Sequence, residues 1–522
     1  MVPGEEIKAR RTRKSEMTKT KFLLFVFIAS LVIKPSATTS NDKGKKNVLL
    51  IIADDMRAEI GAFIDPVSRP WLNADIKTPH IDALASRSAV FKQAYVQQAL
   101  CNPSRTSFLT GRRPETTRVQ DNESWFTKTG NPNIVSMPSY FHKNGYTTVS
   151  LGKVFHHSKT LAANLPETWS LTDFPKNNYD IKTPYFEVSK EKAESKHLQE
   201  QMITEEAKVL LKKASKKYFD TGVPFFFAVG YRRPHLPWVC PKKFMDLYPM
   251  ESIKIPENLM APQGMPPEAW FRSHDMLNYL PEYDTKEWAI NFTLPDQMVK
   301  EFRRAYYGCS SYIDHEVGQL VDYAKDLNLL DNTVIVFIGD HGYHIGERGI
   351  WGKSTVFEND LLAPLMISLP GLTDGGMERN QLVEFVDLFP TLAEASGLPV
   401  PPLCPEDSPL KTNLCVEGIS FMPVIKENIP WKEAAFSQNP YAPFKYGPKT
   451  KKSIGYSMHT GFYRYAEWHS ESVDDSHPTA AFLSDLKEDP LEEINRAYDE
   501  DYADIVKELS SKLKQGWRAF MP

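Results

Sequence analysis

Five short, largely apolar runs set the expected architecture of the chain. Such runs are typical of strands that are covered on both faces of a sheet, and they span Asn47–Ala53, Tyr146–Leu151, Pro224–Val229, Thr333–Gly339 and Leu365–Leu369. Helical patterns lie between them, opening at Thr78-Pro79 and covering Asp296–Leu327 and Leu388–Ser396, the last closed by Gly397. This alternation predicts an α/β fold, with a large domain whose mixed, mostly parallel central sheet is flanked by helices.

The pattern changes after about residue 440. Ile454–Trp468 alternates like a strand, Phe482-Leu483 is a second short strand, and Tyr502–Phe520 is a terminal amphipathic helix. We therefore expect a main domain over residues 45–440 and a small C-terminal α+β subdomain with an antiparallel sheet over 441–522. The stretches Ser158–Glu191 and Tyr248–Glu287 are rich in Pro, Asn and aromatic residues, and are expected to form ordered loops at a pocket rim.

The N-terminus predicts export. Several Lys and Arg residues precede the apolar run Phe22–Ile33, and Ser36-Ala37-Thr38 follows it. This run is too short to span a bilayer comfortably but suits the core of a signal peptide, so residues 1–40 are expected to be removed. A signal anchor is the alternative, disfavoured because Lys34 and Pro35 end the run early. We expect a lysosomal or secreted protein in a eukaryote, or a periplasmic or extracellular one in a bacterium, with no stable membrane span.

Composition narrows the classes of partner. The 522 residues are 41% hydrophobic and 12% aromatic, as in a folded soluble protein, and the formal net charge is −4. Without a global basic field, we expect no nucleic-acid partner, and an anionic substrate would need a local cluster of cations.

The cysteine count is odd. Five cysteines in an exported chain leave at least one unpaired within the chain. Cys404 and Cys415 flank a short loop and are the best candidates for a disulfide. Cys240 and Cys309 have no role that the sequence indicates.

Four polar clusters follow predicted strands. They are Asp54-Asp55, Asp340-His341, Lys153 with His156, and Arg232-Arg233-Pro234-His235. Each alone has an ordinary explanation, because Asp caps helices and Lys or His is usually solvated. In an open α/β sheet, however, function collects at the carboxyl ends of the strands, where these four clusters would meet.

The chemistry of these clusters is complementary. Asp54, Asp55 and Asp340 offer hard oxygen ligands, which suit Ca²⁺ or Mg²⁺, and without a cation three converging carboxylates would raise one another's pKa. Positive charge to hold an anionic substrate could come from Arg105, Lys153 and Lys353. The imidazoles of His156 and His235 can transfer protons near neutral or mildly acidic pH.

A pentad, Cys101-Asn-Pro-Ser-Arg105, precedes a Leu-Thr-Gly-Arg sequence that ends at Arg112. By itself it could be a buried thiol ahead of a short helix, with Pro103 in the first turn. The pentad also resembles the signature of the sulfatases, in which the cysteine is oxidised after synthesis to formylglycine.

From Asn47 to the C-terminus the chain resembles type I sulfatases of the alkaline phosphatase superfamily, and within them the iduronate-2-sulfatase branch. The resemblance rests on NVLLIIADDMR, QQALCNPSRTSFLTGRRPETTR, FHKNGYTTVSLGKVFHH, FFFAVGYRRPHLPW, VIVFIGDHGYHIGERGIWGKS, LVEFVDLFPTLAEASGLPVPPLC and IGYSMHTGFYRYAEW. His341 stands where many sulfatases have Asn but this branch has His. Cys404 and Cys415 fall where the branch has a disulfide.

The resemblance implies a role for each site residue. Cys101 would be converted to formylglycine by a formylglycine-generating enzyme, and Arg105 would hold the aldehyde hydrate that attacks sulfur. Lys153 and Lys353 would grip the sulfate. His235 would assist the departing alcohol, and His156 would help to remove a proton when sulfate is expelled. Ca²⁺, rather than Mg²⁺, would be bound by Asp54, Asp55, Asp340, His341 and the converted Cys101.

The substrate implied is a sulfated oligosaccharide, most simply a terminal 2-O-sulfated iduronate-type uronic acid of heparan or dermatan sulfate. Tyr343 replaces a Trp of the branch near the sugar. Arg118 could meet a sugar carboxylate, although a solvated arginine is the more ordinary interpretation. Alternatives are a sulfatase of ulvan or carrageenan, a phosphodiesterase or phosphonate hydrolase of the superfamily, or a non-catalytic saccharide-binding relative. The last would be expected to lack Cys101, Arg105 or a metal carboxylate, and all are present.

Overall fold

A seven-stranded sheet lies at the centre of the computed structural model, with the strand order β11-β2-β10-β7-β1-β5-β3. In this order the strands are Met377–Glu384, Ala89–Tyr95, Leu365–Ser368, Thr333–Gly339, Asn47–Asp54, Phe225–Pro234 and Thr147–Gly152. Strand β10 runs antiparallel to its neighbours β2 and β7, and the remaining pairs are parallel. The predicted mixed, mostly parallel sheet is therefore confirmed.

The structure describes residues 44–64, 69, 75–156, 183–191, 198–441, 452–470 and 477–522. The predicted signal peptide and most of the predicted loop Ser158–Glu191 lie outside these residues. Among the helices that the structure describes, none is both long and apolar enough to cross a membrane.

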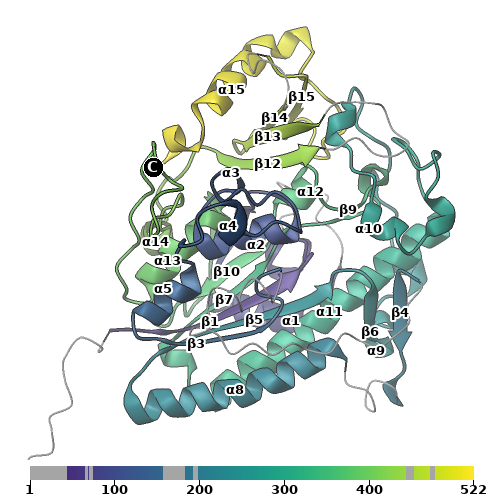
Figure 1. Ribbon diagram of the computed structural model, residues 1–522. Coiled ribbons are helices and arrows are strands. Elements are labelled where there is room, and N and C mark those ends of the chain that lie inside the picture. The colour runs from purple at the N-terminus through teal and green to yellow at the C-terminus, as the bar shows by residue number, and fades with distance from the viewer. Residues whose placement is uncertain are drawn as a thin grey trace, which may run out of the picture. The chain divides into compact units, whose positions relative to one another are not determined.

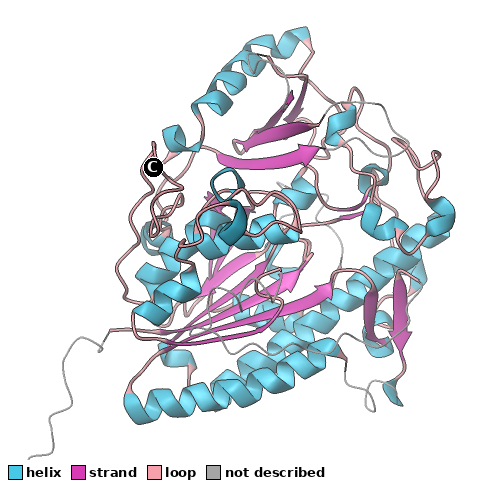
Figure 2. Ribbon diagram, viewed as in Figure 1, coloured by secondary structure: helices cyan, strands magenta, loops and turns pink. Residues whose placement is uncertain are grey.

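Helices cover both faces of the large sheet (Figures 1 and 2). One face carries α1 (Pro79–Ala85), α8 (Gln199–Thr221) and α11 (Asp296–Asp326), and the other carries α2 (Cys101–Thr110), α5 (Met137–Lys143) and α13 (Leu388–Ala395). Every residue of β1 and β7 is buried as a result, which explains their uninterrupted apolar sequences.

The five strands predicted from apolar runs are all present, but β2 and β11 were not predicted. Strand β2 contains Lys92 and Gln93 within its apolar sequence. Strand β11 lies at the edge of the sheet, and its first half alternates between exposed and half-buried residues. An edge strand needs few apolar residues, so its sequence pattern is difficult to distinguish from that of a loop.

A second, antiparallel sheet has the order β12-β13-β14-β15, with strands Ala435–Tyr441, Ser453–His459, Tyr463–Ser470 and Ala480–Asp485. The alternating run Ile454–Trp468 is thus a hairpin of two strands. Helix α15 (Ala503–Gln515) packs on this sheet. Hydrogen bonds join β12 to the segment after β2, from the Ser437 hydroxyl to the Val96 carbonyl and from the Gln438 amide to the Gln97 carbonyl. The proposed division at residue 440 stays a prediction.

Shorter elements complete the described structure. Two small sheets pair β4 (Tyr185–Val188) with β6 (Trp238–Pro241) and β8 (His344–Ile345) with β9 (Trp351–Gly352). The short helices are α3 (Pro114–Thr117), α4 (Phe126–Thr129), α9 (Lys242–Met245), α10 (His274–Leu277), α12 (Glu358–Leu361) and α14 (Met422–Glu427). The predicted rim Tyr248–Glu287 contains α10 and three 3-10 turns. Cys404 and Cys415 form the predicted disulfide, while Cys240 and Cys309 are buried free thiols.

Candidate active site

Two aspartates end strand β1, at the carboxyl edge of the sheet. The pairing of β1 with β5 shifts register between Ala53 and Asp54, so that Asp54 aligns with Pro234. Asp55 adopts a left-handed backbone conformation with φ of 60°, and its backbone N–H donates to Oδ1 of Asp340 over 2.9 Å. Asp is one of the few residue types that tolerate this conformation. The hydrogen bond to Asp340 holds the end of β1 beside the end of β7.

Cys101 is the first residue of helix α2, and only 1% of its surface is exposed. The helix ends at Gly111, whose φ of 66° and close approach to Val416 favour glycine. Burial alone would raise the pKa of the Cys101 thiol, but the positive charges of Lys153 and Lys353 lower it below its usual value. The thiol therefore lies at the N-terminus of a helix, between two lysines that lower its pKa and the carboxylates of Asp54 and Asp340, which raise it.

Arg105 lies one turn further along α2 and joins the two strand ends. Its Nη2 donates to Oδ1 of Asp54 over 3.0 Å, and its Nε donates to Oδ2 of Asp340 over 2.8 Å. Its Nη1 donates to the carbonyls of Lys153 and Val154, which follow β3. All three charged side chains are completely buried. The pentad arginine thus fixes three strand ends in one place.

The two predicted lysines pair with the two aspartates of β1. The Lys153 ammonium lies 2.5 Å from Oδ2 of Asp54, and the Lys353 ammonium lies 2.8 and 2.9 Å from the two oxygens of Asp55. Burial would raise the pKa of Asp54, but Lys153 and Arg105 hold it well below its usual range. Burial and the negative charge of Asp54 together raise the pKa of Asp55, despite Lys353. At Asp55, burial and the neighbouring carboxylate thus outweigh the charge of Lys353.

The surroundings of His341 indicate whether a metal ion would fit the cluster. Its Nδ1 lies 2.8 Å from the Gly342 carbonyl and so carries the proton, while its buried Nε2 has no hydrogen-bond partner. This Nε2 lies 3.5 Å from Oδ1 of Asp55 and 3.6 Å from Oδ2 of Asp340. Burial opposes the charged imidazole, yet the negative charges of Asp340 and Cys101 raise the pKa of His341 to about 10.

The donor atoms are close enough together to share one ion. One atom each from Asp54, Cys101, Asp340 and His341 lie within 4.8 Å of one another, as do one atom each from Asp54, Asp55, Cys101 and His235. The negative charge that holds a proton on His341 would also attract a divalent cation, which would replace that proton at Nε2. Oxygen-rich donor sets favour Ca²⁺ or Mg²⁺ over softer metals.

His235 lies beside this cluster. Its Nε2 is 4.0 Å from Oδ2 of Asp55, and its Nδ1 is 2.6 Å from the Leu236 carbonyl. Burial and the charge of Lys353 hold the pKa of His235 well below its usual value, so the imidazole is neutral and presents an acceptor at Nε2. Its predicted role with the departing alcohol would require that Nε2 first takes up a proton.

The other predicted residues have more varied positions. Tyr343 is buried with its hydroxyl lacking a hydrogen-bond partner, its ring stacks on Tyr306, and the Lys353 ammonium is 5.6 Å from the ring centroid. His156 follows β3 and is half-buried. Arg118 is exposed, with left-handed backbone at the end of α3. The roles assigned to these three residues stay predictions.

Three residues at the site were not predicted. The Ser104 hydroxyl donates to the Asp340 carbonyl, and the Tyr306 hydroxyl donates to the Asp55 carbonyl over 2.7 Å. Oδ2 of Asp275 lies 3.7 Å from the Lys353 ammonium, at the mouth of the site. Ser104 could have been found within the pentad, and Asp275 belongs to the predicted rim. The sequence pattern does not distinguish Tyr306 from the many other buried residues of α11, so it could not be predicted as a site residue.

Comparisons with known proteins agree with this geometry. The family model described as Sulfatase matches residues 46–398, and the model described as N-sulphoglucosamine sulphohydrolase, C-terminal, matches residues 346–518. The chain is 33% identical to the iduronate 2-sulfatase of Mus musculus over 563 residues, which cover 94% of this chain and 97% of that protein.

Solved structures share the fold at lower identity. The phosphonate monoester hydrolase of Agrobacterium radiobacter has a TM-score of 0.67 and 21% identity, covering 90% of this chain and 95% of its own. A protein solved with its substrate D-glucosamine-2-N,6-O-disulfate has a TM-score of 0.63 and 20% identity, covering 90% and 97%.

Proposed function

Because this chain belongs to the sulfatase family and is a sulfuric ester hydrolase, we propose that it removes a sulfate ester from a saccharide at Cys101. The observation that carries this proposal is the convergence of Cys101, three carboxylates and the buried imidazole of His341 in one cluster. The substrate that we propose is the 2-O-sulfate of a terminal iduronate-type residue in heparan or dermatan sulfate. Similarity to iduronate 2-sulfatase over nearly the whole chain supports this choice.

We propose that the cluster holds Ca²⁺, with Asp54, Asp55, Asp340 and His341 as ligands beside the converted Cys101. A bound cation would draw electron density from the sulfate oxygens and lower the energy of the charge that develops on them. It would also offset the repulsion between the Asp54 and Asp55 carboxylates, which contributes to the raised pKa of Asp55.

Conversion of Cys101 to formylglycine would supply a hydrated aldehyde, with one hydroxyl to attack sulfur and a second to allow release. Arg105 is fixed by two carboxylates and two backbone carbonyls, so it orients this group and the strand ends around it. Lys153 and Lys353 approach from opposite aspartates and would bind sulfate oxygens. His235 would first take up a proton from solvent at its acceptor Nε2 and then donate it to the departing alcohol oxygen, while the attacking hydroxyl loses its proton to solvent. His156 would take the proton that is lost on release.

Maturation and location follow from the same proposal. A formylglycine-generating enzyme would act on Cys101 before the chain folds, because the thiol is buried afterwards. The predicted signal peptide would send the chain to a lysosome or the exterior in a eukaryote, or to the periplasm or exterior in a bacterium.

A second candidate is hydrolysis of a phosphonate or phosphodiester, since a phosphonate monoester hydrolase shares the fold. The sequence similarity to a sulfatase favours the first candidate.

The test combines mass spectrometry with sulfate release. The peptide spanning Cys101 is expected to carry formylglycine in native material, and the same preparation should release sulfate from a 2-O-sulfated iduronate disaccharide. A matched 6-O-sulfated disaccharide tests the position of the ester. An unmodified thiol with no sulfate release from either disaccharide would refute the proposal. Release from the 6-O-sulfated disaccharide alone would retain the enzyme but reject the substrate.

A further inference from the structure

A short hairpin separates two residues of the proposed site. His341 precedes strand β8 and Lys353 follows strand β9, with His344 of β8 paired to Gly352 of β9. The mechanism proposed above gives the two residues different tasks, since His341 would bind metal and Lys353 would bind sulfate. Their relative position therefore depends on what holds the two ends of the hairpin together.

The side chain of Asp360, in helix α12, joins these two ends. Its Oδ1 lies 2.7 Å from Nδ1 of His344, and its Oδ2 accepts from the backbone N–H and the hydroxyl of Thr355, over 2.9 and 2.7 Å. A carboxylate only accepts hydrogen bonds, so Nδ1 of His344 is the donor. All three residues are buried. One side chain thus accepts three hydrogen bonds, from both sides of the hairpin.

The backbone of α12 holds the segment between His341 and β8. The Asp360 carbonyl accepts from the Gly342 N–H over 2.8 Å, and the Asn359 carbonyl accepts from the Tyr343 N–H over 2.9 Å. A Cβ atom on Gly342 would collide with the Asn359 carbonyl oxygen, so glycine is needed for this close approach. Helix α12 therefore fixes the chain directly after His341.

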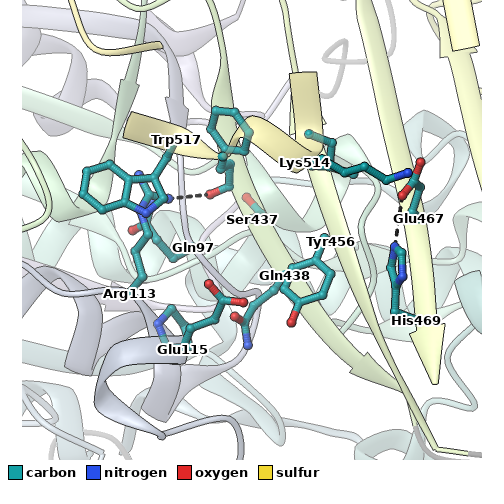
Figure 3. A pocket seen from close by; sticks show the side chains of 14 residues that line it. Gln97, Arg113, Glu115, Ser437, Gln438, Tyr456, Glu467, His469, Lys514 and Trp517 are labelled. Atoms are coloured by element: carbon teal, nitrogen blue, oxygen red, sulfur yellow. Dashed lines mark hydrogen bonds and ion pairs between the residues drawn. The ribbon is translucent and has the colours of Figure 1, made fainter. Parts of the chain in front are cut away.

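The chain after Lys353 has two further contacts. The Ser354 N–H donates to the Ala99 carbonyl over 3.0 Å, and the Ser354 carbonyl accepts from the side-chain amide of Asn439 over 2.7 Å. Asn439 belongs to strand β12, which borders the cavity of about 430 Å³ shown in Figure 3. Both contacts hold the Lys353 side of the hairpin, whereas Asp360 joins that side to the other.

We propose that Asp360 is a positioning residue, which sets the place of Lys353 relative to His341. It is not one of the residues whose donor atoms gather in the metal cluster, so it acts through Thr355 and His344. The tasks of Lys353 and His341 rest on the proposed function. Loss of the hydrogen bonds to Thr355 would release the Lys353 side and weaken binding of a sulfated substrate. Loss of the hydrogen bond to His344 would release the His341 side and weaken metal binding.

Asparagine cannot replace Asp360 without loss, because its side chain has one acceptor oxygen and an NH2 group in place of the other. If the oxygen accepts from Thr355, the NH2 group faces the Nδ1–H of His344. The other tautomer of His344 would turn its proton toward Arg348, whose donor Nη1 lies 3.3 Å from Nε2. If the oxygen accepts from His344 instead, the NH2 group faces the two donors of Thr355. Asp360→Asn therefore breaks one side of the link in either orientation.

The test measures two affinities of the full chain. Calorimetry of a 2-O-sulfated iduronate disaccharide with the Cys101→Ala chain reports the Lys353 side, and the rise in Tm that Ca²⁺ produces in chelator-treated protein reports the His341 side. Thr355→Val removes the hydroxyl and should weaken disaccharide binding at least threefold, with an unchanged response to Ca²⁺. Thr355→Ser keeps the hydroxyl and is the matched control, which should bind like the parent chain. Asp360→Asn should weaken disaccharide binding at least threefold or require at least threefold more Ca²⁺ for the same rise in Tm.

Equal disaccharide affinity of Thr355→Val and Thr355→Ser would overturn the link to Lys353. A lower Tm of Asp360→Asn, with parental affinity for both the disaccharide and Ca²⁺, would show that Asp360 only stabilises the fold. If Asp360→Asn does not fold, the comparison of the two Thr355 variants decides. Failure of the proposed function is distinguishable, because the parent chain would then release no sulfate from any substrate, while the Ca²⁺ response of Asp360→Asn still tests the His341 side.

Discussion

The ammonium group of Lys353 lies 2.8 Å from Oδ1 of Asp55, so a residue proposed to bind sulfate is paired with a residue proposed to bind metal. Lys153 makes the corresponding pair with Asp54. Both lysines therefore neutralise carboxylates that a divalent cation would also neutralise. A bound cation would neutralise part of the negative charge of Asp54 and Asp55 and so weaken their attraction for the two lysines. The ammonium groups could then bind an anionic substrate.

Calcium should stabilise the folded protein. At a free concentration 100 times its Kd, a ligand of the native state adds about 2.7 kcal/mol to the free energy of unfolding. Asp340→Asn should abolish most of the rise in Tm that Ca²⁺ produces in chelator-treated protein. Asp275→Asn is the matched control, since Asp275 is 44% exposed and lies outside the donor cluster. An equal rise in Tm for both variants would contradict the assignment of Asp340 as a ligand.

Removal of Lys353 should matter most when metal is absent. Lys353→Met leaves the buried Asp55 carboxylate without its cation, and breaking a buried pair typically costs about 3–5 kcal/mol. Guanidinium unfolding in chelator should show this loss, and added Ca²⁺ should reduce the difference from the parent protein. Lys512→Met, at a half-buried position with an i,i+4 partner, should change stability by less than about 1 kcal/mol. A loss that does not respond to Ca²⁺ would show that Lys353 and the ion do not share Asp55.

Cys101→Ser should fold but stop after one step. The serine oxygen can form a bond to sulfur while the bond to the alcohol oxygen breaks, but it lacks a second hydroxyl to expel sulfate. We expect release of the alcohol without steady release of sulfate, and a sulfo group on the peptide containing residue 101. Cys309→Ser, at another buried free thiol, should retain turnover. Continuous sulfate release by Cys101→Ser would contradict the mechanism.

The sequence predicted the charged residues of the site more completely than the strands of the large sheet. Apolar strands with polar residues at their ends revealed Asp54, Asp340 and Lys153, because a buried sheet imposes both patterns. Strand β11 is an edge strand whose polar residues resemble a loop, and Tyr306 reaches the site from a long helix by packing alone. Only three-dimensional contacts can reveal such residues.

The disulfide between Cys404 and Cys415 should stabilise the fold through a short loop. The two cysteines are 11 residues apart, and a loop of about that length corresponds to about 3 kcal/mol in the chain-entropy model. The Arg112 guanidinium donates to several backbone carbonyls of the same loop, including those of Cys415 and Pro409. These hydrogen bonds would restrict the loop even when the disulfide is absent. Replacing both cysteines with Ala should therefore cost up to about 3 kcal/mol, measured by urea unfolding. A reductant should destabilise the parent protein and leave the double variant unchanged.

A buried acidic pair on the far side of the sheet should make stability depend on pH. Glu200 of α8 and Glu316 of α11 are 0% and 1% exposed, and no carboxylate oxygen of either makes a hydrogen bond of normal geometry. Burial raises the pKa of Glu316 to about 7, and the charge of Glu200 adds to this shift, against opposing effects of Thr204 and Lys208. Glu316 is therefore protonated in the folded protein at mildly acidic pH.

The sign of the effect follows from this raised pKa. Between the unfolded value near 4.5 and the folded value of about 7, the native state binds the extra proton, so the contribution of Glu316 to stability is present at low pH and is lost as pH rises. The loss by pH 7 is about 3 kcal/mol, at about 1.4 kcal/mol per pKa unit. Glu316→Gln should remove this slope and raise the free energy of unfolding at pH 7.5, measured by urea titration from pH 4.5 to 8. Asp322→Asn, at an exposed position of the same helix, should keep the slope of the parent protein. An unchanged slope in Glu316→Gln would show that Glu316 is ionised in the folded state.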